Sequence, residues 1–70
     1  MRTKSLGDII REKREAKGWT QSELAEMLNT YATTIGRYER DQSIPNVWMA
    51  YDIAETLGCS LYELLGIEGG

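Results

Sequence analysis

Apolar residues recur at intervals of three and four along nearly the whole chain, which is the spacing of amphipathic helices. No segment alternates between apolar and polar residues in the manner of a half-buried strand. The first apolar stripe contains Leu6, Ile9 and Ile10, and it predicts a helix over about residues 6–17 that Gly18 ends. The chain is therefore expected to be all-α.

Two further helices are predicted on either side of a short turn. Thr20 and Glu23 have the spacing of a capping box, in which each side chain accepts a hydrogen bond from the other residue's backbone amide. The helix that they open carries Leu24 and lasts about two turns. Asn29 ends it, because asparagine is the commonest substitute for glycine in a left-handed cap. A third helix is expected over about residues 32–40.

The remaining residues predict two more helices. Asn46 is expected to cap a fourth helix that Gly58 ends, and Ser60 and Glu63 form a second capping box, which opens a short fifth helix. The apolar stripe expected on the fourth helix consists of Val47, Ala50, Tyr51, Ala54 and Leu57.

Five short helices fit one small domain, because 70 residues support only a single compact core. We predict this domain over residues 5–66, with flexible ends at residues 1–4 and 67–70. Trp48 and Tyr62 lie off the apolar stripes, so they are expected to be partly exposed. The core is expected to include Trp19, Leu24, Ile35 and Leu57.

The third helix separates two kinds of side chain. An arc of about 140° carries the small, polar and cationic residues Ala32, Thr33, Gly36, Arg37 and Arg40. The opposite side carries Ile35, Tyr38 and Glu39. Two short helices joined by a tight turn, with such a face on the second, predict a helix-turn-helix formed by the second and third helices.

The small residues of this face suit the major groove of B-DNA. Ala32 and Thr33 offer methyl groups to a thymine, and the Thr33 hydroxyl can bond a base edge. Gly36 allows a close approach of the helix, and Arg37 can fork onto guanine or grip a phosphate. We therefore predict that bases are read by this part of the third helix.

Four further residues are expected to position the protein on the DNA backbone. Arg40 suits a phosphate clamp, and the helix N-termini at Gln21 and around Tyr31 add amide donors where the helix dipole favours an anion. Asn46, at the start of the fourth helix, is assigned the same positioning role.

The charge distribution fits a polyanionic partner. The chain has eight Lys and Arg against eleven Asp and Glu, a net charge of −3. Residues 1–20 sum to +3, residues 21–40 to −1 and residues 41–70 to −5. A basic leading segment on an acidic protein suits one face that approaches nucleic acid, although solvated helix faces with chance clustering give the same pattern.

The composition argues against metal sites, cofactors and most catalytic sites. There is no histidine, and Cys59 is the single cysteine, expected to be a small buried filler. A zinc site, a histidine-based triad and an internal disulfide are thereby excluded, and we expect no metal, no cofactor and no enzymatic activity. No apolar run suggests a signal or a membrane span, so we expect a cytoplasmic protein.

Three blocks of sequence closely resemble the phage repressor/Cro-type, or XRE-like, helix-turn-helix family. They are TQSELAEMLN at 20–29, TIGRYER at 34–40 and AETLGCS at 54–60, in the order and spacing of that family. The resemblance covers about residues 6–65. It implies a lambda-repressor-like domain of five helices that reads operator DNA.

The resemblance also implies roles for single residues. Gln21 would either cap its helix against a phosphate or buttress the recognition helix. Arg14 would pair with Glu39 in a buried, structural ion pair. The residues implied to face bases are Ala32, Thr33, Gly36 and Arg37.

Four positions depart from the family pattern. Asn29 replaces the usual glycine of the turn, and Thr30 and Tyr31 replace a small apolar residue and a Ser or Thr cap. Either Thr30 caps the third helix one residue early, or the Tyr31 phenol reaches a phosphate. Asp41 replaces a common glycine, and it either lowers non-specific DNA affinity or initiates the turn.

Two classes of function follow from these residues. The first is a sequence-specific duplex-DNA-binding repressor of phage or prophage type, which occupies a palindromic operator as a homodimer and excludes polymerase. Its dimer surface would include Tyr62, Leu65 and Ile67. The alternative is an antitoxin-like or other protein-interaction module whose main partner is a protein, which the acidic C-terminal half and the exposed aromatic residues favour.

Overall fold

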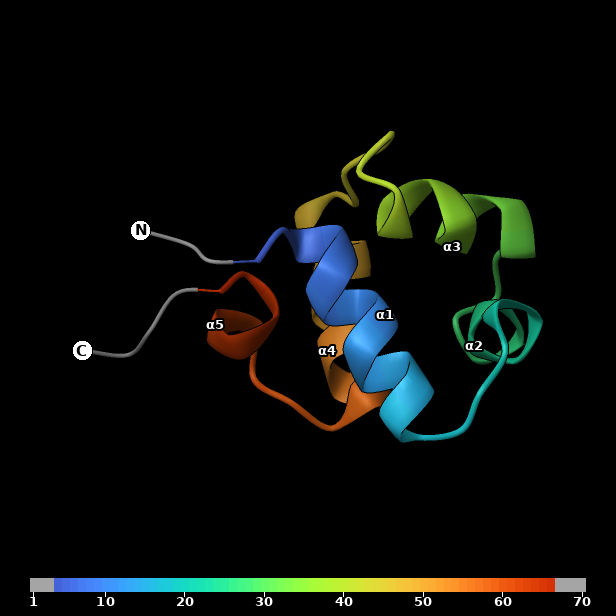
Figure 1. Cartoon of the computed structure of the whole chain (residues 1–70), viewed down its shortest axis with the longest axis horizontal. Helices are drawn as coiled ribbons and strands as arrows, with labels where there is room; N and C mark the ends of the chain where they lie inside the picture. The colour runs from blue at the N-terminus through green and yellow to red at the C-terminus, as the bar shows by residue number, and fades with distance from the viewer. Residues whose placement is uncertain (1–3, 67–70) are drawn as a thin grey trace.

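The computed structural model describes residues 4–66, and it contains five helices in that part of the chain (Figure 1). They are α1 (Leu6–Ala16), α2 (Gln21–Met27), α3 (Ala32–Glu39), α4 (Val47–Leu57) and α5 (Leu61–Leu64). No strand occurs between residues 4 and 66, so the all-α prediction is confirmed. The predicted flexible ends lie outside the described residues, apart from Lys4.

The helix boundaries follow from local capping chemistry. The capping boxes at Thr20 and Ser60 are both present, and a third, which the sequence analysis missed, is formed by Ser5 and Asp8 at the start of α1. Asn46 Oδ1 accepts the amide of Met49 at 2.9 Å and so caps α4 as predicted. Each of these caps satisfies a backbone amide that the helix leaves without a partner.

The core receives one fully buried aliphatic side chain from every helix. These side chains are Ile10, Leu24, Ile35, Ile53 and Leu64, in chain order. Burial of one such side chain contributes roughly 1.5–3 kcal/mol, so each helix is held by its own anchor. Of the predicted core, Leu24, Ile35 and Leu57 are buried, and Trp19 is partly buried against them.

The predicted apolar stripe of α4 was wrong at two positions. Val47 is 64% exposed and Tyr51 is 51% exposed, whereas Ile53, which the prediction omitted, is fully buried. The buried stripe is Ala50, Ile53, Ala54 and Leu57. These residues follow each other at intervals of three, one and three, so they share one face, and the two larger side chains lie outside that face.

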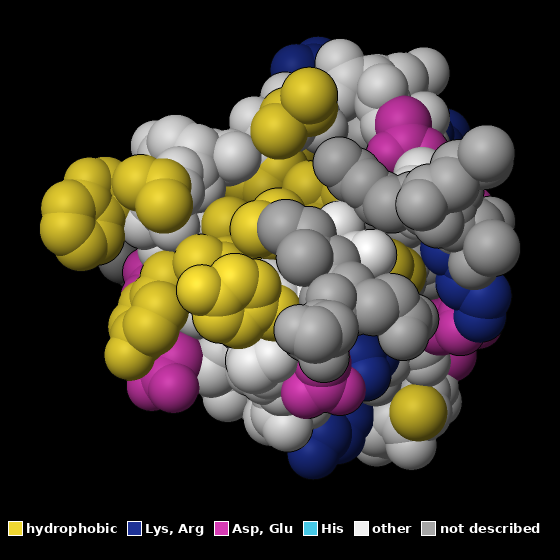
Figure 2. Space-filling model, turned by 90° about the vertical axis from the view of Figure 1, so that its left-hand side faces the viewer, with side chains coloured by type: hydrophobic (Ala, Val, Ile, Leu, Met, Phe, Trp, Pro, Cys, Tyr) yellow, Lys and Arg dark blue, Asp and Glu magenta, His cyan; other side chains and the backbone are white. Residues whose placement is uncertain are grey.

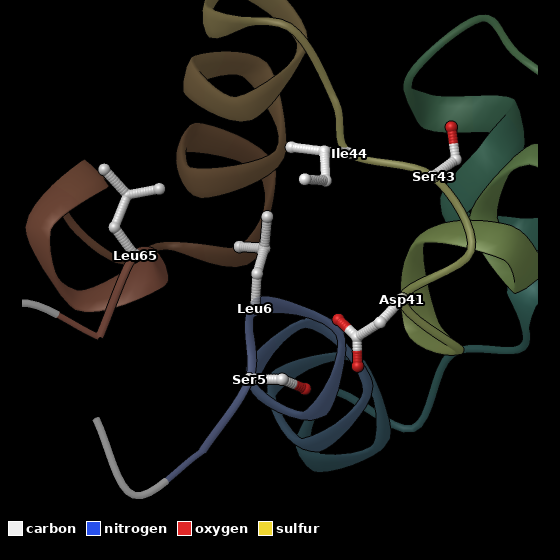
Figure 3. Close-up of a pocket in the computed structure, with 6 residues that line it drawn as sticks. All are labelled: Ser5, Leu6, Asp41, Ser43, Ile44 and Leu65. Atoms are coloured by element: carbon white, nitrogen blue, oxygen red, sulfur yellow. The ribbon is translucent and has the colours of Figure 1, made fainter. Parts of the chain in front are cut away.

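The first turn of α1 lies against the end of α3. The Gly7 amide donates to Asp41 Oδ1 at 3.1 Å. Asp41 lies just after α3, and its side chain points toward α1 (Figure 3). Asp41 has a φ of +59°, the left-handed conformation in which helices commonly end. Asp41 therefore adopts a conformation that glycine reaches readily, and its side chain adds a hydrogen bond from the end of α3 to α1. Of the two predicted roles, the turn is the one seen.

Candidate nucleic-acid interface

α2 and α3 form the expected helix-turn-helix. α2 is seen end-on in Figure 1 while α3 lies across the view, so their axes cross steeply. Asn29, with a φ of +56°, ends α2, and the amide of Thr30 donates to the Ala25 carbonyl at 2.9 Å. Residues 28–31 therefore connect the helices in a tight turn, as predicted from Asn29.

The start of α3 settles where its cap lies. Tyr31 is the N-cap residue, in extended conformation, and its side chain makes no capping hydrogen bond. The alternative in which Thr30 caps the helix one residue early is therefore wrong. The Tyr31 side chain is 76% exposed, so its phenol projects from the start of α3.

The two faces of α3 differ as the helical wheel predicts. Ile35, Tyr38 and Glu39 are buried. On the opposite side Thr33, Arg37 and Arg40 are exposed and Ala32 is half-buried. The exposed side therefore presents a hydroxyl and two guanidinium groups next to a small apolar side chain, which are groups that can contact base edges and phosphates.

Gly36 is the exception on this face, because it is buried rather than exposed. A Cβ atom added to Gly36 would lie 3.0 Å from Arg40 Nη1 and 3.5 Å from Gln21 Oε1. Arg40 follows Gly36 by one helical turn, so its guanidinium lies over the glycine. The small size of Gly36 thus makes room for Arg40.

A buried hydrogen-bonding network holds α3 in place from behind. Arg14 Nε donates to Glu39 Oε2 at 2.6 Å and Arg14 Nη2 donates to Glu39 Oε1 at 3.1 Å, so the expected ion pair is present and bidentate. Arg14 Nη1 also donates to the Trp19 carbonyl at 2.6 Å. The hydrogen bonds to Glu39 raise the pKa of Arg14. The pair links α1 to α3, and Arg14 also ties the connection before α2.

Gln21 joins this network from α2. Its Nε2 donates to Glu39 Oε1 at 3.0 Å, so in this structure Gln21 buttresses α3. Its Oε1 lies near Gly36. Gln21 therefore stands between the buried ion pair and the exposed cationic face of the helix-turn-helix.

Other kinds of site have little support in the described residues. No group of three or more His, Cys, Asp and Glu residues between positions 4 and 66 could hold a metal ion. Burial raises the pKa of the Cys59 thiol, which disfavours the nucleophilic thiolate. Each helix in this part of the chain falls short of the length and hydrophobicity that a membrane crossing requires.

The predicted dimer surface lies at the opposite end of the molecule from α2. Tyr62 is 66% exposed on α5 and Leu65 follows the helix half-buried, while Ile67 lies outside the described residues. Leu65 lines a pocket of about 250 Å³ between the start of α1 and the segment before α4 (Figure 3). Its other lining residues are Ser5, Leu6, Asp41, Ser43 and Ile44.

This fold and this face define a helix-turn-helix domain of the repressor class, and comparison with known proteins agrees. A family model described as helix-turn-helix matches residues 10–64. The chain belongs to this family, in its phage repressor/Cro or XRE-like branch. It is thus a member of a family of DNA-binding transcriptional regulators.

Curated relatives match the chain over most of its length. The transcriptional regulator ImmR of Bacillus subtilis is 36% identical over 62 residues, which are 89% of this chain and 49% of ImmR. Multiprotein-bridging factor 1 of Schizosaccharomyces pombe is 31% identical over 58 residues, which are 83% of this chain and 39% of that protein. The chain thus spans less than half the length of these relatives.

Solved structures of phage and bacterial regulators share the fold. The P22 c2 repressor in complex with a synthetic operator superposes with a TM-score of 0.88 at 27% identity, covering 94% of this chain and 100% of that one. SinR in complex with DNA superposes with a TM-score of 0.80 at 28% identity, covering 86% of this chain and 97% of that one.

Proposed function

We propose that this protein binds a specific duplex-DNA operator by inserting α3 into the major groove. The observation that carries the proposal is the division of α3: Thr33 and Arg37 are exposed, while Glu39 is fixed on the far side by α1 and α2. A recognition helix needs one face that is fixed by the rest of the domain and one face that is exposed. The fixed face holds the side chains that read bases in register with the DNA. The complexes of the P22 c2 repressor and SinR with DNA support the same use of the fold.

The exposed residues divide between reading bases and gripping the backbone. Ala32, Thr33 and Arg37 specify the site, with Arg37 forking onto guanine or gripping a phosphate. Contacts to the DNA backbone, which position the protein, are made by Gln21, Tyr31, Arg40 and Asn46. The cap of α4 occupies only the acceptor of the Asn46 amide, so its donor can contact a phosphate. Gly36 contributes by leaving room for the Arg40 guanidinium next to it.

Selection from a random duplex-DNA pool at moderate salt, followed by sequencing of the retained DNA, tests this proposal. We expect enrichment of a palindrome with half-sites about one helical turn apart. Arg37→Ala should weaken binding to that site by about 1–3 kcal/mol and relax selection at one base position per half-site. Arg11→Ala removes an exposed arginine from α1 and is the matched control, expected to leave the enriched sequence unchanged. No enriched sequence for the unmodified protein would refute operator reading.

The repressor would act as a homodimer on this operator and exclude polymerase. One recognition helix reads only a few base pairs, so specificity among many competing sites favours two copies. Tyr62, Leu65 and Ile67 are the proposed dimer surface, with the pocket beside Leu65 as a recess for an apolar side chain of the second copy.

Tyr62→Glu is expected to abolish the dimer, because it places a carboxylate in that surface. Sedimentation equilibrium without DNA should show only monomers, and binding to the palindromic duplex should lose its cooperativity. Tyr51→Glu is the matched control on α4, and it should leave the dimer intact. An unchanged dimer in the Tyr62→Glu protein would place the contact elsewhere.

A protein-interaction function is the second candidate, and the exposed apolar side chains of α4 favour it. A relative named for bridging several proteins shares the helix-turn-helix region with this chain. The two functions are compatible, since they use different surfaces of the domain.

A further inference from the structure

We propose that the outer face of α4 docks a cationic amphipathic helix from another protein. The outer face is defined by Val47, Trp48, Tyr51, Asp52 and Glu55, all of them exposed. They are related by intervals of three, four, seven and eight residues, so they form one surface of the helix.

The apolar half of this face is not needed by the domain's own core. Trp48 is 77% exposed and Val47 64%, although α4 is already anchored by the buried residues on its opposite side. Exposed tryptophan and tyrosine side chains are enriched where proteins bind other proteins, because they bury a large area and lose little conformational freedom. Large apolar side chains that are exposed and do not contribute to the core indicate a contact surface.

The negative charge of the outer face of α4 favours a positively charged partner. Asp52 and Glu55 follow the aromatic residues along α4, and residues 41–70 contain five acidic residues and no lysine or arginine. A helix with an apolar stripe flanked by Lys or Arg would bury the aromatic side chains and pair its cations with these carboxylates. A lysine or arginine can also lie over the Trp48 ring. A second copy of this acidic face would instead bring like charges together.

Apart from its first residue Val47, which adjoins Asn46, the outer face of α4 lies away from the proposed DNA-binding residues of α2 and α3. α2 and α3 lie at the right of Figure 1, and Figure 2 looks onto the molecule from the left. A broad hydrophobic area bordered by acidic side chains is visible on this side (Figure 2). A docked helix and an operator could therefore be bound at the same time, which is the arrangement a regulator needs to bring another protein to DNA.

Two synthetic helical peptides of about five turns test the proposal against the full chain. Both carry the same leucine stripe, which is flanked by lysine in one peptide and by glutamate in the other. Fluorescence anisotropy of the labelled peptides should show that the lysine peptide binds at least about tenfold more tightly. Trp48→Ala should weaken its binding by about tenfold or more, and Asp52→Asn with Glu55→Gln should weaken it and flatten its salt dependence.

Met27→Ala, at an exposed apolar residue of α2, is the control variant outside this face, and it should not change peptide affinity. Equal binding of the two peptides, no binding of either, or binding unaffected by Trp48→Ala would each overturn the proposal. A dimer that dissociates in Trp48→Ala would overturn it as well, since the face would then belong to a second copy. The measurement uses no DNA, so its outcome is separate from that of the operator selection.

Discussion

Replacing Glu39 by leucine is expected to lower the free energy of unfolding by about 3–5 kcal/mol, because it leaves the Arg14 charge buried without its partner. The side chains of Arg14 and Glu39 are only 10% and 3% exposed, so water cannot replace the lost carboxylate. A 70-residue domain has a total stability of roughly 3.5–10 kcal/mol. Urea unfolding followed by circular dichroism should therefore show a transition midpoint at a much lower urea concentration than for the unmodified protein.

The double replacement of Arg14 by methionine and Glu39 by leucine tests whether the unpaired charge causes the loss of stability. It removes both charges and fills their space with apolar groups, so it should recover most of the stability lost by the single variant. It also removes the acceptor of Gln21 Nε2, so operator affinity should remain below that of the unmodified protein. A double variant as unstable as Glu39→Leu alone would show that volume, not the unpaired charge, sets the loss.

The helices could be predicted because their ends are coded locally. Thr20 and Ser60 each begin a capping box, and Asn29 and Gly58 adopt left-handed conformations that end the preceding helices. Those signals depend on residues three or four apart, so no knowledge of tertiary packing is needed. The division of α3 into a buried and an exposed side follows from its period in the same way.

Contacts between distant helices could not be predicted in this way. The hydrogen bond from Gly7 to Asp41 joins residues 34 positions apart, and only the tertiary fold brings them together. The Arg40 guanidinium and the Gln21 amide lie next to Gly36, and a helical wheel does not show where these side chains point. The pairing of Arg14 with Glu39 was expected only through the resemblance to a family. The sequence pattern of an amphipathic helix does not distinguish a buried arginine from a solvent-exposed one.

Gly7 is the residue that the sequence analysis overlooked, although glycine in the first turn of a predicted helix was a usable signal. Glycine costs a helix roughly 0.5–1 kcal/mol relative to alanine, so its presence indicates that something approaches the backbone closely. A Cβ atom at Gly7 would lie 2.5 Å from the carbonyl oxygens of both Tyr38 and Glu39 and 2.8 Å from Asp41 Oδ1. The first turn of α1 thus packs directly on the end of α3.

Gly7→Ala is therefore expected to destabilise the domain by about 1–3 kcal/mol, although helix propensity alone would make alanine stabilising at this position. Ala16→Gly, at the exposed last residue of the same helix, is a glycine–alanine exchange without such a contact and should cost at most about 0.5–1 kcal/mol. The double variant Gly7→Ala with Asp41→Ala should stay destabilised, because the two backbone carbonyls remain in place after the carboxylate is gone. Chemical denaturation of the three proteins gives the comparison. Stabilisation by Gly7→Ala would mean that α1 and α3 do not meet at this point.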